Sequence, residues 1–276
     1  MSNLHVIVAP SCSGKDVFAR HLIDTGHWDL VVSATTRPPR AGEVHGINYL
    51  FLDDEDFVSM IDRGDLLEHA NFSGKYYGTP SSELGRIRSS GKIPLAIVEP
   101  KGARSIQNWC ASNNVPLSLM RIDASLSILT KRFCDRFSDD VEKVKSDSGK
   151  IPDKLVSYYA DRLASSFFTE HSWASILDYD RAIPLMNTED EGRVQAQKLT
   201  SSVLEGGHQF KIPESSGPLR DYGSGTSRST ENYFIQKVSR VLHQGASSNF
   251  PSDYILPLIT DIQKQCEKTF LLKYQA

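Results

Sequence analysis

Residues 5–22 read HVIVAPSCSGKDVFARHL, and this stretch decides the fold. The apolar, β-branched run at its start predicts a buried strand, and the amphipathic run from Lys15 predicts a helix after a short turn. A turn of this kind points backbone N–H groups out at the start of a helix, where phosphates bind. The usual phosphate-loop pattern is G-x-x-x-x-G-K-[ST], but here Ala9 replaces the first glycine and Asp16 replaces the last hydroxyl. From these residues alone, a nucleotide site and an ordinary strand-to-helix turn are equally open.

The loop still offers most of the chemistry that a triphosphate requires. Residues 11–14 are small, which lets the backbone approach phosphate oxygens, and Lys15 is placed to bridge the outer phosphates. Asp16 supplies an anionic oxygen, and Mg²⁺ accepts carboxylate ligands readily, either directly or through water. The sequence therefore predicts a Mg²⁺ ligand at Asp16, provided that the metal and Lys15 compensate its charge.

Composition excludes several classes of protein. The 276 residues are 39% hydrophobic and 24% charged, as in ordinary soluble domains, and the net charge of −3 gives no basic field for nucleic acid. The four cysteines are far apart and form no C-x-x-C pair, which favours reduced thiols in a cytoplasmic protein. The N-terminus lacks the pattern of a signal peptide, and no apolar run approaches the ~18 residues of a membrane span. We expect neither a nucleic-acid partner nor a membrane partner.

Short apolar segments alternate with amphipathic ones through the first two thirds of the chain. LHVIVA, LVVSATT, NYLFLD, IPLAIVEP, PLSLMRID and AIPLMN read as strands, and LLEHANFSGKYYG reads as a small antiparallel sheet. A helix is expected from Asp53 or Asp54 to a stop at Gly64, and another is expected after the capping pair Thr79-Pro80, ending at Gly91. Strand–helix alternation predicts an α/β fold, with a parallel sheet flanked by helices.

The rest of the chain differs from this pattern in composition. Residues 135–162 are highly charged, and by pattern alone they read as a solvated helix–loop–helix. Residues 205–228 are rich in Gly, Ser and Pro and read as a linker. Two helical patterns follow at 229–276, where either a hairpin that packs back on the core or a homodimerisation arm is expected. The predicted domains are thus 1–204, the linker, and a helical C-terminal extension.

Two further motifs place charged and hydroxyl groups at close spacing. SATTRPPRAGEVHGINYLFL at 33–52 brings Arg37 and Arg40 together, and the planar fork of arginine suits a phosphate dianion. LLEHANFSGKYYGTP at 66–80 adds Glu68 and a pair of phenols. By themselves, arginines on a loop are usually solvated and tyrosines usually pack in the core.

The T-T-R-x-P-R-x-G-E-x-x-G-x-x-Y and F-S-G-x-Y-Y-G runs resemble guanylate kinases in both identity and spacing. The resemblance covers about residues 4–204 and is strongest at 30–80. It implies the P-loop kinase fold, with a small GMP-binding sheet at about 33–90 and a helical lid at about 135–162. It also implies ATP-dependent phosphorylation of GMP or dGMP, with Mg²⁺ bound to the ATP.

The resemblance implies a role for each matching residue. The acceptor GMP is expected at Ser33, Arg37, Arg40, Tyr49, Glu68, Tyr77, Thr79 and Glu99. ATP is expected at Ser11, Cys12, Ser13, Gly14, Lys15, Asp16 and Asn187, and the transferring phosphoryl group at Lys15, Arg132, Arg136 and Arg162. This chain departs from the family in two places: Glu99 stands where the family has aspartate, and Ile97 stands where it has another acidic residue.

Two other functions are compatible with these motifs. One is a kinase for a different acceptor, including a modified deoxynucleoside monophosphate, because G-K-D loops resemble those of related kinases. The other is a non-catalytic guanylate-kinase-like binding module, although such modules typically lose the loop lysine and Lys15 is present here. The sequence does not choose between GMP and dGMP.

Overall fold

The computed structural model describes residues 3–40, 42–72, 74–98, 100–123, 125–148, 152–167, 177, 179–184, 186–206, 228–248 and 252–274. The chain forms two compact units. The sheet unit comprises residues 1–9, 14–123 and 177–219, and the helical unit comprises residues 10–13, 124–176 and 220–276. No helix in the described ranges is long and apolar enough to cross a membrane.

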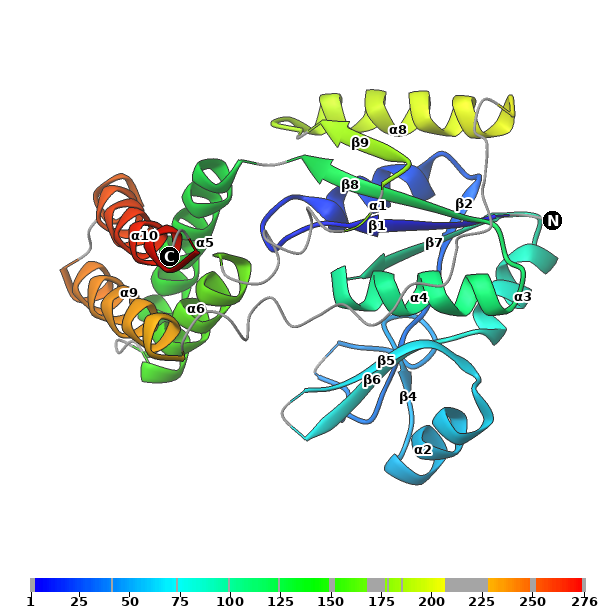
Figure 1. The fold of residues 1–276 in the computed structure, drawn as a ribbon, viewed down its shortest axis with the longest axis horizontal. Helices are drawn as coiled ribbons and strands as arrows, with labels where there is room; N and C mark the ends of the chain where they lie inside the picture. The colour runs from blue at the N-terminus through cyan, green and yellow to red at the C-terminus, as the bar shows by residue number, and fades with distance from the viewer. Residues whose placement is uncertain are drawn as a thin grey trace. The chain divides into compact units, whose positions relative to one another are not determined.

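The sheet unit is built on five parallel strands (Figure 1) in the order β2-β7-β1-β8-β9. β1 (Leu4–Val8) is central, flanked by β7 (Ile93–Val98) and β8 (Leu117–Asp123), while β2 (Trp28–Leu30) and β9 (Arg181–Pro184) form the edges. Every residue of β1 is buried. A central strand covered on both faces is predominantly apolar, which explains the run LHVIV, in which His5 is the polar residue. The predicted α/β class with a parallel sheet is confirmed.

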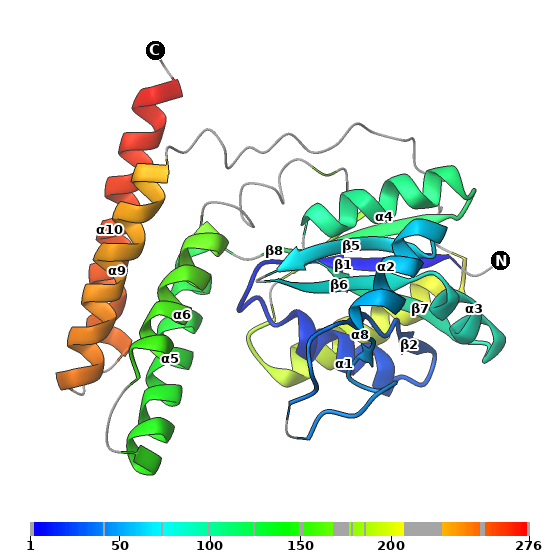
Figure 2. The ribbon, with the colours of Figure 1, turned by 90° about the horizontal axis from the view of Figure 1, so that it is seen from below.

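Helices cover both faces of this sheet (Figure 2). α1 (Lys15–Asp24) and α8 (Glu189–Leu204) pack together on the face where Ile7 joins Phe18 and Leu22 in one apolar cluster. α3 (Ser82–Ser89) and α4 (Pro100–Ser112) cover the opposite face, where alternate residues of β1 point. This alternation is the two-residue side-chain period of a strand.

A second sheet in the same unit has the order β4-β3-β6-β5. β3 (Ala34–Thr35) pairs parallel with β4 (Leu50–Phe51) and antiparallel with β6 (Lys75–Pro80), which pairs in turn with β5 (Leu66–Phe72). The predicted small sheet at 66–78 is therefore confirmed, and β3 and β4 enlarge it.

Two local predictions were wrong. LVVSATT was predicted as one strand, but β2 ends at Leu30 in the large sheet and β3 begins at Ala34 in the small one. The Thr79-Pro80 pair was predicted to cap a helix, but it ends β6, and α3 begins at Ser82 and ends at Ser89. Ladder pairing with β5, with Thr79 opposite Glu68, outweighs the local capping preference.

α2 (Asp54–Arg63) begins and ends as its sequence predicts. The Asp53 carboxylate accepts the backbone N–H of Asp56 at 2.7 Å, which satisfies an otherwise unpaired donor of the first turn. Gly64 ends the helix with φ of 70°, a left-handed conformation that glycine adopts without strain.

The helical unit consists of α5 (Leu126–Ser148), α6 (Asp153–Ser165), α9 (Arg228–Ser248), α10 (Ser252–Tyr274) and the loop Pro10–Ser13. One continuous apolar cluster joins the four helices. α9 packs against α6 and α10, and α10 packs against α5. The helical extension is confirmed, and it shares a core with the helices of the predicted lid. The domain boundaries at 204 and 228 remain predictions.

Candidate active site

The predicted base-recognition pair lies on neighbouring strands of the small sheet. Thr79 donates its hydroxyl to the Glu68 carboxylate at 2.7 Å, and the two residues are directly opposite in the β5–β6 ladder. A bulge between Leu66 and Glu68 shifts the register at this point. Bulges change the direction of side chains near functional sites. Here the bulge ends at Glu68, the residue whose carboxylate was predicted to bind guanine.

Two glycines fit closely around Glu68. A Cβ on Gly78 would lie 2.9 Å from the Glu68 carbonyl oxygen and 3.0 Å from the Phe57 ring. A Cβ on Gly102, in the first turns of α4, would lie 3.5 Å from the Glu68 carboxylate. A Cβ on Gly78 would therefore clash with β5, whereas a Cβ on Gly102 would make ordinary contact with the Glu68 carboxylate.

The predicted phosphate-binding residues meet on the loop between β3 and β4. Arg37 donates to both carboxylate oxygens of Glu43 at 2.9 Å, and Glu43 also accepts the Arg40 backbone N–H at 2.7 Å. These hydrogen bonds, that of Arg37 first, hold the pKa of the Glu43 carboxyl below its usual range. Glu43 thus orients the guanidinium of Arg37 and holds the backbone of the loop at Arg40 through a hydrogen bond.

Glu43 is the residue that the sequence-based site left out. It lies inside the motif T-T-R-x-P-R-x-G-E, between the arginines and Tyr49, so its position was visible in the sequence. Its role was not visible, because the spacing does not reveal that its carboxylate turns back onto Arg37. The glycines beside it, Gly42 and Gly46, adopt φ of 84° and 79° and allow the chain to fold back tightly.

Aromatic side chains line the same loop. The Arg37 guanidinium lies 5.5 Å from the centre of the Tyr49 ring, and the Tyr49 and Tyr77 rings meet edge to face at 6.3 Å. Burial raises the pKa of the Tyr49 phenol, so Tyr49 stays protonated and able to donate a hydrogen bond. Arg37, Tyr49 and Tyr77 thus form a cluster of donors suited to a phosphate.

For the other predicted acceptor positions, the structure gives backbone and packing contacts among the described residues. The Ser33 carbonyl accepts the Leu50 backbone N–H at 2.9 Å, which ties the start of β4 to the segment before β3. Glu99 lies outside the described residues. Ile97, at the position where the family has an acidic residue, pairs with Ile7 in the parallel sheet and packs in its apolar cluster.

The predicted donor residues fall in both units. In the helical unit, Arg132 of α5 donates to the carbonyls of Cys12 and Ser13 at 3.4 and 3.3 Å, and Arg162 of α6 donates to the Ser11 hydroxyl at 2.7 Å. Ser13 is completely buried, and its hydroxyl has no hydrogen-bond partner in the described part of the chain. The structure therefore brings two predicted lid arginines onto the predicted phosphate loop.

Cys12 adopts φ of 63° and Gly14 adopts φ of 86°. The left-handed conformation costs a non-glycine residue about 1 kcal/mol or more. With left-handed residues on both sides of Ser13, this loop has the type of backbone conformation found in anion-binding nests.

In the sheet unit, Lys15 and Asp16 open α1, with 3.6 Å between the Lys15 ammonium and the Asp16 carboxylate. The Asp16 side chain is 76% exposed, so its carboxylate is open to a ligand. No group of three or more His, Cys, Asp or Glu residues able to hold a metal occurs among the described residues. A single carboxylate fits Mg²⁺, which is typically held by one or two carboxylates together with substrate phosphates and water.

Asn187 lies in the turn between β9 and α8 and is exposed. Its backbone N–H donates to the Glu191 carboxylate at 2.7 Å, and Thr188 caps α8. The turn therefore has a defined shape, and the Asn187 side chain faces solvent.

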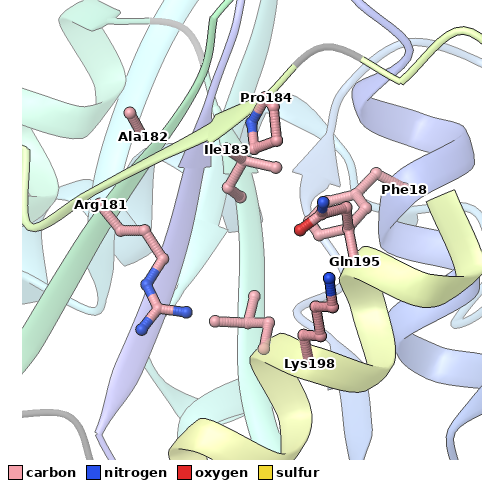
Figure 3. A pocket seen from close by; sticks show the side chains of 8 residues that line it. Phe18, Arg181, Ala182, Ile183, Pro184, Gln195 and Lys198 are labelled. Carbon is pink, nitrogen blue, oxygen red and sulfur yellow. The ribbon is translucent and has the colours of Figure 1, made fainter. Parts of the chain in front are cut away.

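A cavity of about 250 Å³ lies at the edge of the large sheet (Figure 3). Arg181 and Pro184 of β9, Phe18 of α1, and Gln195 and Lys198 of α8 line it, and Arg181 also donates to Ser202 of α8 at 3.2 Å. None of its lining residues belongs to the predicted acceptor or donor set.

Comparison with known proteins identifies the family. A family model described as guanylate kinase matches residues 1–166. The guanylate kinase of Legionella pneumophila (strain Paris) is 32% identical over 157 residues, covering 56% of this chain and 74% of that protein. The guanylate kinase of a Synechocystis species is 39% identical over 137 residues, covering 49% and 70%. A crystal structure of guanylate kinase from Anaplasma phagocytophilum aligns with 85% of this chain and 96% of its own, at 21% identity and a TM-score of 0.49. The family model alone spans more than half of the sequence, and the chain belongs to the guanylate kinase family.

Proposed function

We propose that this protein transfers the γ-phosphoryl group of ATP to GMP or dGMP and releases ADP and the nucleoside diphosphate. The observation that carries the proposal is the acceptor site, where the Glu68–Thr79 pair and the Arg37–Tyr49–Tyr77 cluster belong to the same small sheet and its loop. The first is suited to a polar base and the second to a phosphate. A purine monophosphate needs both.

Base selection follows from the direction of the hydrogen bonds. Glu68 can accept the N1–H and the exocyclic amine of guanine together, and the Ser33 hydroxyl can donate to O6. Thr79 donates its hydroxyl proton to Glu68 and so holds the carboxylate that reads the base. Adenine reverses the donor–acceptor pattern at its six position and would leave buried polar groups unpaired. The site should therefore select guanine strongly over adenine. We assign Glu99 an additional contact with the base, by analogy with the aspartate of the family.

On the donor side, phosphoryl transfer requires positioning and positive charge more than covalent chemistry. We assign Lys15, Arg132, Arg136 and Arg162 to the transferring group, residues 11–16 to the ATP phosphates, and Asn187 to the adenine side. Arg40 joins Arg37 and the tyrosines in orienting the acceptor oxygen. Bound Mg²⁺ would neutralise charge between phosphate oxygens, and Asp16 is the residue that would hold it.

A coupled assay of ADP formation from ATP and GMP tests this proposal. Lys15→Ala should abolish turnover while leaving GMP affinity nearly unchanged, and Lys264→Ala, on the exposed face of α10, serves as the control. Near-normal turnover by Lys15→Ala would contradict the assignment of Lys15 to the transferring phosphoryl group. Glu68→Gln should raise the KM for GMP more than any other acceptor variant. A panel of nucleoside monophosphates, dGMP and modified guanine nucleotides included, identifies the preferred acceptor.

Asp16 has its own test. Asp16→Ser restores the hydroxyl of the usual loop, so we expect activity to be largely retained with a shifted Mg²⁺ dependence. The same Mg²⁺ profile in both proteins would count against a metal-binding role for Asp16.

We also expect a cytoplasmic protein with reduced thiols. Burial raises the pKa of the Cys110 and Cys134 thiols to about 12 each, which keeps them protonated and unreactive. Homodimerisation through the C-terminal extension would have to use surface outside the shared helical core, such as Tyr233 or Leu258, which are about 40% exposed. Native mass measurement decides the oligomeric state.

A further inference from the structure

α9 and α10 lie outside the family match, which ends at residue 166, yet they form half of the core behind the lid helices. Phe234 of α9 stacks on Phe167 just after α6, with ring planes 6° apart. Ile255, Ile259 and Cys266 of α10 are at most 2% exposed and belong to the same cluster as Phe133 and Phe137 of α5. The helices that carry Arg132, Arg136 and Arg162 therefore pack against chain that lies beyond the family match.

A buried polar contact joins α10 to α5 within this apolar core. Gln263 of α10 and Thr130 of α5 are 4% and 0% exposed, and the Gln263 side-chain amide donates to the Thr130 hydroxyl oxygen at 2.9 Å. The Thr130 hydroxyl donates its own proton to the Leu126 carbonyl at 2.8 Å. The result is a directed relay from α10 through Thr130 into the first turn of α5. Buried and satisfied hydrogen bonds specify one arrangement where apolar contacts alone allow sliding.

This contact sets the rotation of α5 about its axis. Successive residues of a helix are about 100° apart, so Thr130 and Arg132 are about 200° apart and project on nearly opposite sides. Thr130 faces α10, while Arg132 reaches the carbonyls of Cys12 and Ser13 in the phosphate loop. A rotation of α5 that breaks the first contact would also draw the Arg132 guanidinium away from the loop.

We propose that Gln263 is a positioning residue for phosphoryl transfer. Acting through Thr130, it holds α5 in the rotation that aims Arg132 at the phosphate loop. α9 and α10 form the fixed backing for this arrangement. This inference rests on the proposed function and adds to it a determinant of ATP use from a segment beyond the family match.

The test is a double-mutant cycle in the full-length chain. Gln263→Met keeps the side-chain length and removes the amide, and Thr130 retains its own bond to Leu126, so the protein should stay folded. We expect kcat/KM for ATP to fall about three- to tenfold, as for loss of one buried hydrogen bond, with the KM for GMP unchanged. In a Thr130→Val background, Gln263→Met should have little further effect, because the relay is already broken.

A matched control separates positioning from stability. Val238→Ala trims the same core on α9, from a residue that is completely buried and makes no polar contact with α5. It should lower the Tm at least as much as Gln263→Met and leave kcat/KM for ATP nearly unchanged. Equal losses of ATP use in both variants, or additive effects of Thr130→Val and Gln263→Met, would overturn the proposal.

A second readout does not need turnover. The affinity for a non-hydrolysable ATP analogue, measured by calorimetry, should fall in Gln263→Met and not in Val238→Ala, and equal affinities would overturn the proposal. Absence of GMP-dependent ADP formation by the unaltered chain contradicts the proposed function instead. The two failures are thus distinguishable.

Discussion

Glu43 lies at the centre of the acceptor loop, where it accepts two hydrogen bonds from Arg37 and one from the Arg40 backbone. Replacing it by glutamine removes the charge and one of the two acceptors of the fork. We expect Glu43→Gln to raise the KM for GMP by about three- to tenfold, because Arg37 loses its bidentate orientation. Steady-state kinetics on Glu43→Gln measure this change, and Glu55→Gln on the exposed face of α2 serves as the control. An unchanged KM would show that the phosphate orients Arg37 without help.

The same carboxylate gives a pH dependence of known sign. Arg37, followed by the Arg40 backbone, lowers the pKa of Glu43 in the folded state. Its pairing therefore stabilises the fold above the unfolded-state pKa of about 4.3, and this contribution is lost as pH falls through the lowered folded-state pKa. The Tm advantage of the unaltered protein over Glu43→Gln should be constant near pH 7 and shrink below about pH 4. An advantage that grows toward acid would contradict the pairing.

Gly78 is the second residue on which the shape of the predicted acceptor site depends. A Cβ at this position would meet backbone of β5 at 2.9 Å and the Phe57 ring at 3.0 Å, so the strands must move apart. We expect Gly78→Ala to destabilise the protein by about 1–3 kcal/mol and to raise the KM for GMP through Glu68. Gly85→Ala is the matched control, because Gly85 lies inside α3 with nothing near its Cβ position. Urea unfolding of both variants tests the difference.

Most of the predicted acceptor residues stand in long motifs of fixed spacing, which is why the sequence could name them as candidates. It did not reveal their partners. That Arg37 binds Glu43 and that Gly102 lies beside Glu68 depend on how the loop and α4 fold back in space. Likewise, Cys12 read only as a small loop residue, whereas its φ of 63° makes it a conformational feature of the loop.

Among the elements, α9 and α10 approach each other at Gly245. A Cβ there would lie 2.5 Å from the Cδ1 atom of Ile255, which is 1% exposed and has little room to move. We expect Gly245→Ala to lower the stability of the helical unit by about 1–3 kcal/mol. Ile255→Val removes the Cδ1 methyl group but keeps a Cγ1 atom, which would lie 2.9 Å from the added Cβ. It should therefore recover part of this loss, although alone it costs about 0.5–1.5 kcal/mol. Thermal unfolding of the two single variants and the double variant measures the coupling, and simple additivity would contradict the close contact.

Elements with a strong apolar period were the predictable ones. β1, β7 and β8 carry predominantly apolar runs and α2 carries clear caps, so local signals agree with their tertiary environment. The segment 30–36 was mispredicted because one apolar run serves two sheets, and a periodicity does not show where a chain changes sheet. The Thr79-Pro80 pair failed because ladder pairing is a nonlocal interaction.

At the scale of the whole molecule, the two units share one chain in an interleaved order. Residues 10–13 belong to the helical unit, although the chain on both sides of them belongs to the sheet unit. All the predicted acceptor residues in the described ranges lie in the sheet unit, whereas α9 and α10 complete the core of the helical one.

A chain that ends at Glu205 tests whether GMP binding depends on the sheet unit and ATP use depends on the complete helical unit. It would lose α9 and α10 and expose the apolar faces of α5 and α6. We expect it to lose ATP-dependent turnover and to self-associate, because large apolar patches promote association. The acceptor residues remain, so the GMP affinity of the soluble fraction should stay within about threefold. Calorimetric titration with GMP and circular dichroism measure both outcomes. Full turnover by the shortened chain would show that the extension is dispensable.

The pairing of Arg37 with Glu43 also has a kinetic consequence. An incoming phosphate meets a loop in which the charge of one arginine is already neutralised by a neighbouring carboxylate. Long-range steering depends on uncompensated charge and is screened by salt. Encounter with GMP should therefore be governed by fit after contact more than by attraction at a distance. Its association rate should change little with ionic strength.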